Sequence, residues 1–333
     1  MMSKPYEPID KQIERLKSRG LVINNLDLAK KILMRENYYS VINGYKDLFI
    51  LDDPENFIVG TTFEEIYSLY SFDRELRNIL IGYLLKFENI IKSVITDYFC
   101  AAHPEETAPY LDYKNYDKSQ NNKVFTIAKL IATLANIIQQ EEKKEGAVDH
   151  YLTKYNHVPL WVLKNFMTFG NIQWMYSFLK QPLKRTIAKH FAQEFKDDYK
   201  EDYNEQYFFD ESIILSVLKT SNFFRNICAH EERLYNFKMK RKPEVTQIAQ
   251  ILDINSTIIS NGNLFTLITS LKIVLEKKDF YELGEKLKKL FEKYENEFQI
   301  VTFESIRDVM GFPEDWVSLL VKDTQTSSTV ESL

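Results

Sequence analysis

Apolar residues recur at intervals of three and four along almost the whole of this 333-residue chain. That spacing puts apolar side chains on one face of an α-helix, whereas a half-buried β-strand needs apolar and polar residues in strict alternation. No segment of the sequence alternates clearly in that way over the length of a strand. The sequence therefore predicts an all-α fold of about ten helices.

Flanking residues help to predict where these helices begin and end. Thr62 followed by Glu65 has the spacing of a capping box, so a long helical stretch is expected from there to about residue 99. The predicted helices cover 10–18, 27–36, 62–99, 123–144, 160–179, 182–195, 211–229, 243–254, 264–275 and 279–298. The acidic stretch 195–202 is interpreted as a solvated linker.

A cluster of turn-forming residues from Asp52 to Asn56 is the best candidate for a domain boundary. We therefore expect an N-terminal helical segment over 1–55 and a larger helical domain over 56–322. The last residues, 323–333, include a run rich in serine and threonine and are predicted to form a disordered tail.

Composition excludes several kinds of site. The nine glycines are never closer than sixteen positions, whereas Walker and Rossmann phosphate loops need two or three glycines within about six residues. Cys100 and Cys228 are the two cysteines, too few and too far apart for a zinc knuckle or a disulfide scaffold. We expect no metal and no cofactor.

The N-terminus is polar and charged, without the apolar core of a signal peptide, and no apolar stretch has the length of a membrane span. These features predict a soluble, cytoplasmic protein without a membrane partner.

The formal net charge of −5 argues against a uniformly basic surface for nucleic acid, but one local basic run stands out. Its members are Lys238, Lys240, Arg241 and Lys242. We predict that these four residues bind RNA phosphates, and the alternative is an ordinary solvated loop.

Two of the five histidines follow an arginine by five positions. The pairs are Arg185 with His190 and Arg225 with His230. Because this spacing also arises by chance, the flanking residues must decide between the pairs. The first pair lies in a pattern typical of an amphipathic surface helix, whereas in the second the arginine is followed by Asn226.

One segment resembles the signature of the Abi-like (abortive infection, D/F type) phage-resistance family, namely 218–236 with the sequence LKTSNFFRNICAHEERLYN. Further segments are similar to that family in order and approximate distance. They are 4–21, 38–46 with its Tyr-Tyr and Gly-Tyr pairs, 72–77, 159–162 and 168–170. The likeness covers about residues 4–240. One departure is Glu231, where many members carry a second histidine.

This resemblance implies a HEPN-like helical bundle, because the Abi-like family belongs to the HEPN superfamily of all-helical nucleases. Their motif is an arginine, then a polar residue, then a histidine four to six positions after the arginine. Arg225, Asn226 and His230 match it and become the expected catalytic residues. The resemblance also implies an anti-phage toxin that cleaves RNA as a homodimer and is restrained by an RNA or protein antitoxin.

The chemistry suits those residue types. Cleavage of RNA by its own 2′-hydroxyl needs a base, an acid, and a cation for the charge on phosphorus, but no metal. Histidine transfers protons near neutral pH, and arginine grips phosphate through two parallel hydrogen bonds. Since one histidine cannot be base and acid in one step, a two-fold dimer with both His230 side chains in one cleft would supply both. Glu88 is a candidate carboxylate for orienting the motif.

Helix geometry leaves some alternatives open. Residues five apart on a continuous helix differ by about 140° in direction, so Arg225 and His230 would point apart. Either the helix ends or distorts before His230, or the site combines groups from two chains. The segment is alternatively a buried hydrogen-bond network with a structural role. Two other functions are a non-catalytic HEPN-fold module that binds a structured small RNA, and a protein-binding sensor of a phage component.

Overall fold

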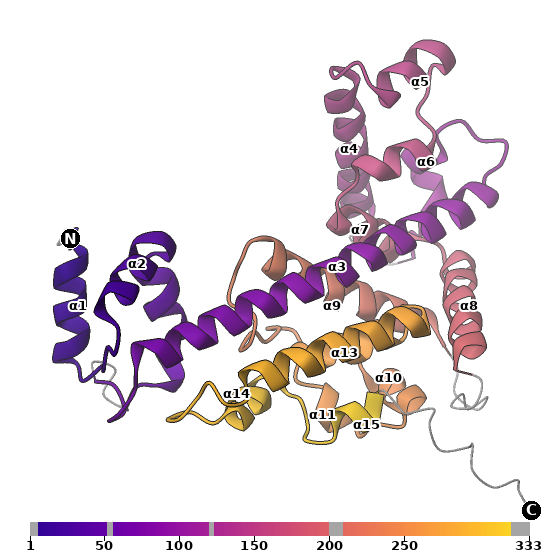
Figure 1. Ribbon diagram of the computed structural model, residues 1–333. Coiled ribbons are helices and arrows are strands. Elements are labelled where there is room, and N and C mark those ends of the chain that lie inside the picture. Colours follow the sequence, from indigo (N-terminus) through magenta and orange to yellow (C-terminus); the bar gives the residue numbers. More distant parts are fainter. Residues whose placement is uncertain (1–5, 52–55, 120–122, 200–208, 321–333) are drawn as a thin grey trace, which may run out of the picture. The chain divides into compact units, whose positions relative to one another are not determined.

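The computed structural model describes residues 6–51, 56–119, 123–199 and 209–320, which are largely helical (Figure 1). Extended pairing within these residues is limited to three isolated bridges, and no strand forms. The predicted all-α class is thus confirmed. Four predicted features fall wholly or partly outside the described residues. These features are the turn cluster at 52–55, Lys4 and Pro5 of the opening segment, 200–202 of the acidic stretch, and the tail 323–333. The predicted domain limits therefore stay predictions.

The helices follow one another along the chain in a simple order. The first are α1 (Ile9–Ser18), α2 (Leu26–Glu36), the π-helical turn η1 (Tyr39–Asn43), the 3-10 turn η2 (Lys46–Leu48) and α3 (Phe63–Ala101). There follow η3 (Pro109–Leu111), η4 (Tyr113–Asn115), α4 (Lys123–Glu142), α5 (Ala147–Tyr155), α6 (Leu160–Leu163), η5 (Lys164–Phe166) and α7 (Phe169–Phe178). The last are α8 (Gln181–Asp198), α9 (Glu211–Ala229), α10 (Thr246–Leu252), α11 (Ser256–Ile259), α12 (Leu264–Lys272), α13 (Lys277–Tyr294), α14 (Phe303–Met310) and α15 (Trp316–Leu320).

The capping box predicted before α3 is present. The Glu65 amide donates to Thr62 Oγ1 at 3.1 Å, and the Glu65 carboxylate accepts the Thr62 amide at 3.3 Å. One continuous helix then runs from Phe63 to Ala101. The predicted start of this stretch is confirmed because both halves of the reciprocal pair form.

Two other predictions are wrong in part. The expected helix over 160–179 is interrupted, because Met167 is extended and Thr168 starts a new helix, α7, with its own capping box. The expected linker over 195–202 is helical as far as Asp198, because Phe195 is buried one turn after Phe191 and continues the apolar stripe of α8.

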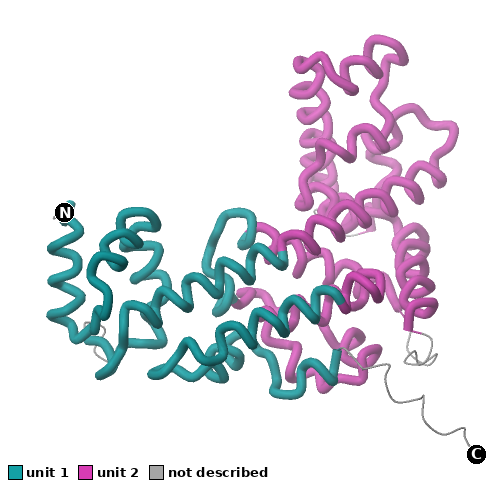
Figure 2. Tube along the Cα trace, in the orientation of Figure 1, with its two compact units in different colours: residues 1–80, 227–237, 282–333 teal, residues 81–226, 238–281 magenta. Residues whose placement is uncertain are grey.

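The chain divides into two compact units (Figure 2). Unit 1 comprises Met1–Leu80, Ile227–Phe237 and Glu282–Leu333, and unit 2 comprises Ile81–Asn226 and Lys238–Tyr281. Three of the four limits between the units fall within α3, α9 and α13, so each of these helices contributes residues to both units.

Unit 1 packs α1 against α2 and has an aromatic core. The rings of Phe72 and Phe291 lie 6.0 Å apart, and both are buried. The Glu65 carboxylate, besides its part in the capping box, accepts the N–H groups of Gln299 and Ile300 at 2.6 and 2.8 Å. A single buried carboxylate therefore joins the start of α3 to the chain that follows α13.

Unit 2 packs α4 against α5 and α7, and its most enclosed element is α12, every residue of which is buried. Asn263 caps α12 by accepting the Thr266 amide at 3.2 Å. The Thr266, Thr269 and Ser270 hydroxyls donate to carbonyls, at 2.7 to 3.1 Å, so their burial carries no unpaired hydroxyl. Among the described helices, none combines the length and the apolar character that crossing a membrane requires.

Candidate active site

The predicted motif lies at the C-terminal end of α9. The helix ends at Ala229, so His230 is the half-helical residue that caps it. The Glu232 amide donates to the Ile227 carbonyl at 3.0 Å, and the Glu231 amide to the Cys228 carbonyl at 3.4 Å. These two bonds, with Glu231 at a φ of 55°, form a Schellman motif. Of the geometric alternatives, the ending of the helix before His230 is therefore the one confirmed.

Glu231 occupies the position of this motif that glycine usually fills. A left-handed conformation at a residue with a side chain costs roughly 1 kcal/mol. The turn persists because hydrogen bonds to buried side chains of α3 hold the chain beyond it. This position is also where the sequence departs from the family pattern.

Arg225 lies on the last turns of α9 and is held by a carboxylate on α3, within unit 2. Its Nε donates to Glu88 Oε2 at 3.2 Å, and Lys92 Nζ donates to Glu88 Oε1 at 2.7 Å. The Glu88 side chain is only 6% exposed. Burial of this carboxylate is costly, and two cations offset that cost. The predicted contact between Glu88 and the motif is present.

This contact leaves much of the Arg225 guanidinium available. Glu88 takes Nε, and Nη1 makes only a long bond of 3.5 Å to Asn226 Oδ1. The Arg225 side chain is 28% exposed, and Asn226 is exposed. A fixed, partly exposed guanidinium whose terminal amino groups are not taken up by a carboxylate is suited to a phosphate, since two parallel N–H groups match two phosphate oxygens.

An exposed aromatic residue lies one helical turn before Asn226. Phe223 is 52% exposed on α9, and residues three apart share a helix face. Sequence reasoning missed this residue, because an apolar residue in an apolar helix is normally assigned to the core. An exposed ring beside an amide is suited to stacking on a base.

His230 is exposed, and within the described residues of unit 1 its imidazole has no hydrogen-bond or ion-pair partner. It therefore does not belong to a buried structural network in that unit. An exposed, unengaged imidazole is free to exchange protons with a ligand.

The chain just beyond His230 is anchored by Asp73, a fully buried residue of α3 in unit 1. Its carboxylate accepts the N–H groups of Leu234 and Tyr235 at 3.0 and 2.6 Å and the Tyr45 hydroxyl at 2.6 Å. Burial, together with the Asp73 carboxylate, raises the pKa of Tyr45, so its phenol stays protonated and donates. Asp73 also forms an ion pair with Arg77, one turn further along α3.

Arg77 and Arg233 strengthen this anchor. Arg77 Nη1 donates to the Glu232 carbonyl at 3.2 Å, and Arg233 Nη1 donates to the Gly44 carbonyl at 2.5 Å and to Asp47 Oδ2 at 2.6 Å. Three segments that resemble the family, namely those around 45, 73 and 234, therefore meet in unit 1. Sequence reasoning noted the segments but gave no reason for them to touch.

Cys228 is not a nucleophile candidate. Burial raises the pKa of its thiol to about 12, so the neutral form predominates at physiological pH. It packs as a small apolar residue at the end of α9.

The basic run lies in unit 2, and all four of its cations are exposed. Between them Met239 is buried, and its amide donates to the Gly262 carbonyl at 2.9 Å. Gly262 has a φ of 66°, and a Cβ there would lie 3.0 Å from Met239 Cβ, so glycine is required. This anchor fixes the run at Met239, while the four cations stay exposed. Contact with phosphate stays a prediction.

Comparison with protein families decides the affiliation of the chain. The model of the Abi-like protein family matches residues 31–236, which is more than half of the sequence. The chain belongs to the Abi-like protein family. Comparisons with curated proteins and with solved structures give no significant match.

The part that matches the Abi-like family is shorter than the likeness expected over 4–240, and it omits the opening segment. It contains Glu88 and Asp73 on α3 together with the motif from Arg225 to His230. The basic run lies just outside it. The family match therefore covers the anchored motif and not the predicted RNA-binding cations.

We predict that Glu88→Gln lowers the free energy of unfolding by about 3 kcal/mol, because it leaves the nearly buried Lys92 without a counter-ion. The matched control is Glu141→Gln, which breaks a pair with the exposed Lys144 and should cost less than about 1 kcal/mol. Urea unfolding of both variants makes the comparison. Equal losses would show that the pair on α3 has no special role.

Proposed function

We propose that this chain is a metal-independent endoribonuclease of the HEPN type that acts as an abortive-infection effector. The observation that carries the proposal is the set of side chains at the end of α9. Within six positions it has an arginine fixed by a buried carboxylate, an exposed amide, and an exposed histidine at the cap of the helix. Membership of the Abi-like family supports the setting in phage defence.

In the proposed reaction the 2′-oxygen of a ribose attacks the adjacent phosphorus, and its proton passes to a base. The bond from phosphorus to the 5′-oxygen breaks, and an acid gives that oxygen a proton. The products are a 2′,3′-cyclic phosphate and a 5′-hydroxyl. Arg225 stabilises the charge on the phosphoryl oxygens, and His230 transfers a proton. Asn226 orients the phosphate or the imidazole through its amide.

The proton count supports a dimer. Each chain contributes one motif histidine, and a single imidazole cannot accept one proton and donate another in the same step. A two-fold axis near the ends of two α9 helices would place two His230 side chains in one cleft. His230 in unit 1 and Phe223 in unit 2 are both exposed, so each side chain is accessible to a second chain.

An enzyme that cuts cellular RNA must be restrained until infection. We therefore propose a cognate antitoxin, either RNA or protein, for this chain. The basic run from Lys238 to Lys242 follows the motif within twelve positions and would bind phosphates of the substrate or of a regulatory RNA.

The test compares the native chain with His230→Ala in EDTA on a single-stranded RNA. Loss of an acid–base residue should slow cleavage by about 100- to 10,000-fold, with 2′,3′-cyclic ends formed by the native chain only. His150→Ala is the matched control, because that histidine is exposed on α5 and has no proposed role. Expression of each variant in bacteria should show the same order of toxicity.

Cleavage that is equal in the native chain and in His230→Ala would contradict the enzymatic role. If neither chain cleaves and both bind RNA, the result would favour the alternative function, a non-catalytic module that binds RNA. Unfolding in urea should be similar for both variants, since each replaced side chain is exposed, so a loss of activity would not reflect a loss of fold.

The basic run gives a separate prediction, measured in the His230→Ala background to prevent cleavage. The double variant Lys240→Glu, Arg241→Glu should bind RNA more weakly and with a shallower salt dependence, by about 0.7 in log–log slope for each lost phosphate contact. The control is Lys143→Glu, Lys144→Glu, which reverses two exposed cations near the end of α4. An unchanged slope would identify the run as an ordinary solvated loop.

A further inference from the structure

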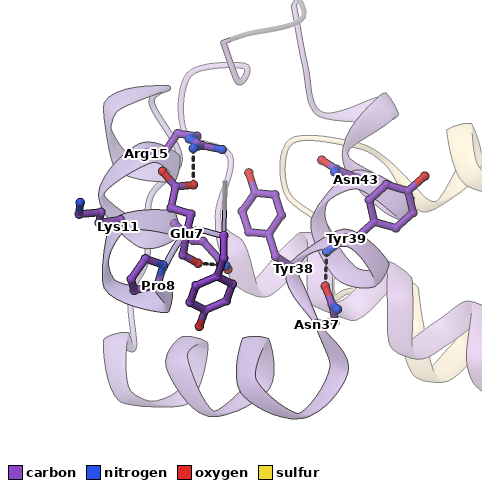
Figure 3. A pocket seen from close by; sticks show the side chains of 10 residues that line it. Glu7, Pro8, Lys11, Arg15, Asn37, Tyr38, Tyr39 and Asn43 are labelled. Carbon is purple, nitrogen blue, oxygen red and sulfur yellow. Dashed lines mark hydrogen bonds and ion pairs between the residues drawn. The ribbon is translucent and has the colours of Figure 1, made fainter. Parts of the chain in front are cut away.

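Unit 1 contains a cavity of about 450 Å³ far along the sequence from the motif. It lies between the start of α1 and the segment that joins α2 to η1 (Figure 3). Tyr6, Tyr38 and Tyr39 are among the residues that line it, with Lys11 and Gln12 from α1. Its size falls within the range of sites for small organic ligands.

An unusual backbone conformation shapes one wall. Asn37 caps α2 with a φ of 73°, and its side-chain oxygen accepts the Tyr39 amide at 2.8 Å. The chain then turns through the π-helical η1. π-Helical turns and positive φ at residues other than glycine are both more frequent at ligand sites than elsewhere. Here they place two consecutive tyrosines at the cavity.

Two of the three tyrosines at the cavity are largely exposed and so are not part of the core. Tyr6 is 85% exposed and Tyr39 is 73% exposed, whereas burial raises the pKa of Tyr38, whose phenol stays neutral. Figure 3 shows the Tyr38 ring in the middle of the view, with Tyr39 and Asn43 together on one side of it. Flat rings that the protein core does not use are suited to stacking on flat ligands.

The polar groups at the cavity include amides, cations and one carboxylate. Gln12 donates through its nitrogen to the Glu7 carbonyl at 2.7 Å, which leaves its side-chain oxygen available. Asn43 is exposed, and its side chain has no hydrogen-bond partner within the described residues of unit 1. Amide side chains pair with the edges of nucleobases, because both carry a donor beside an acceptor.

The charge at the cavity is weakly positive, although the chain as a whole is acidic. Arg15 forms an ion pair with Glu7, and both side chains stay partly exposed. Lys11 is exposed and has no ion pair within the described residues of unit 1. A balanced pair with one additional cation suits a single phosphate next to a bound base and does not suit a long polyanion.

We infer that this cavity binds an unpaired nucleobase of single-stranded RNA by stacking on tyrosine and hydrogen bonding to amides. The inference rests on the proposed function only in taking the nucleic acid to be RNA. Sequence-specific recognition of RNA depends on such splayed bases, which aromatic rings stack and polar side chains read. Residues 6–15 lie outside the part that matches the family, so the family match does not cover this wall.

The experiment measures binding of a fluorescent single-stranded RNA of about 12 nucleotides, within the site sizes usual for such binding. All variants carry His230→Ala. Tyr39→Ala and Tyr6→Ala should each weaken binding roughly 5- to 100-fold, the range for loss of one stacked base. Tyr39→Phe should stay within about twofold, because it keeps the ring. Tyr155→Ala, at a half-exposed tyrosine on α5 far from the cavity in sequence, is the control.

A second probe separates bases from phosphates. An abasic oligomer of the same length keeps every phosphate and should bind weakly, with an affinity that Tyr39→Ala does not change. Wild-type affinity in both alanine variants would overturn the inference and would leave a protein segment as the occupant to test. Equal sensitivity of the abasic and native oligomers to Tyr39→Ala would overturn it too.

Failure of this inference and failure of the proposed function give different results. If His230-dependent cleavage is found while the tyrosine variants bind normally, the proposed enzymatic function is supported and the cavity does not bind the base. If the tyrosine variants lose binding while no His230-dependent cleavage is found, the inferred base-binding role of the cavity is supported and the chain binds RNA without cutting it.

Discussion

Two buried carboxylates on α3 hold the segments on which the motif depends. Asp73 fixes the chain that follows His230 in unit 1, and Glu88 fixes Arg225 in unit 2. A carboxylate in a dry interior is stable only when hydrogen-bond donors or cations surround it. Asp73 is surrounded by two backbone N–H groups, a phenol and Arg77, and Glu88 is surrounded by two cations. The strained turn at Glu231 can persist because its exit is fixed in this way.

The consequence is a division of roles at the end of α9. Arg225 is partly enclosed and oriented, which suits its proposed role of meeting charge at a fixed place. His230 is exposed at the helix cap, which suits its proposed role of exchanging protons with a substrate. Cys228 between them is buried with a raised pKa and remains inert. The end of α9 thus has a partly enclosed arginine and, at its cap, an exposed histidine.

Local features of the fold could be predicted from the sequence, because they depend on periodicity and on short-range bonds. The α9 bounds and the capping box of Thr62 with Glu65 are of this kind. The Asp73 network joins residues 28 and 162 positions apart, which no local pattern reveals. The break at Met167 and the tyrosine cavity depend on single backbone conformations, which periodicity does not encode.

The central claim is that this chain cleaves RNA by means of the RNA's own 2′-hydroxyl. It is tested most directly with one RNA made in two forms, all-ribose and with a single 2′-deoxyribose at the mapped cleavage position. The account predicts that the native chain, in EDTA, cuts the all-ribose form there and leaves the substituted form intact. Cleavage of both forms at that position would contradict it, because the attacking group would then come from water or from the protein.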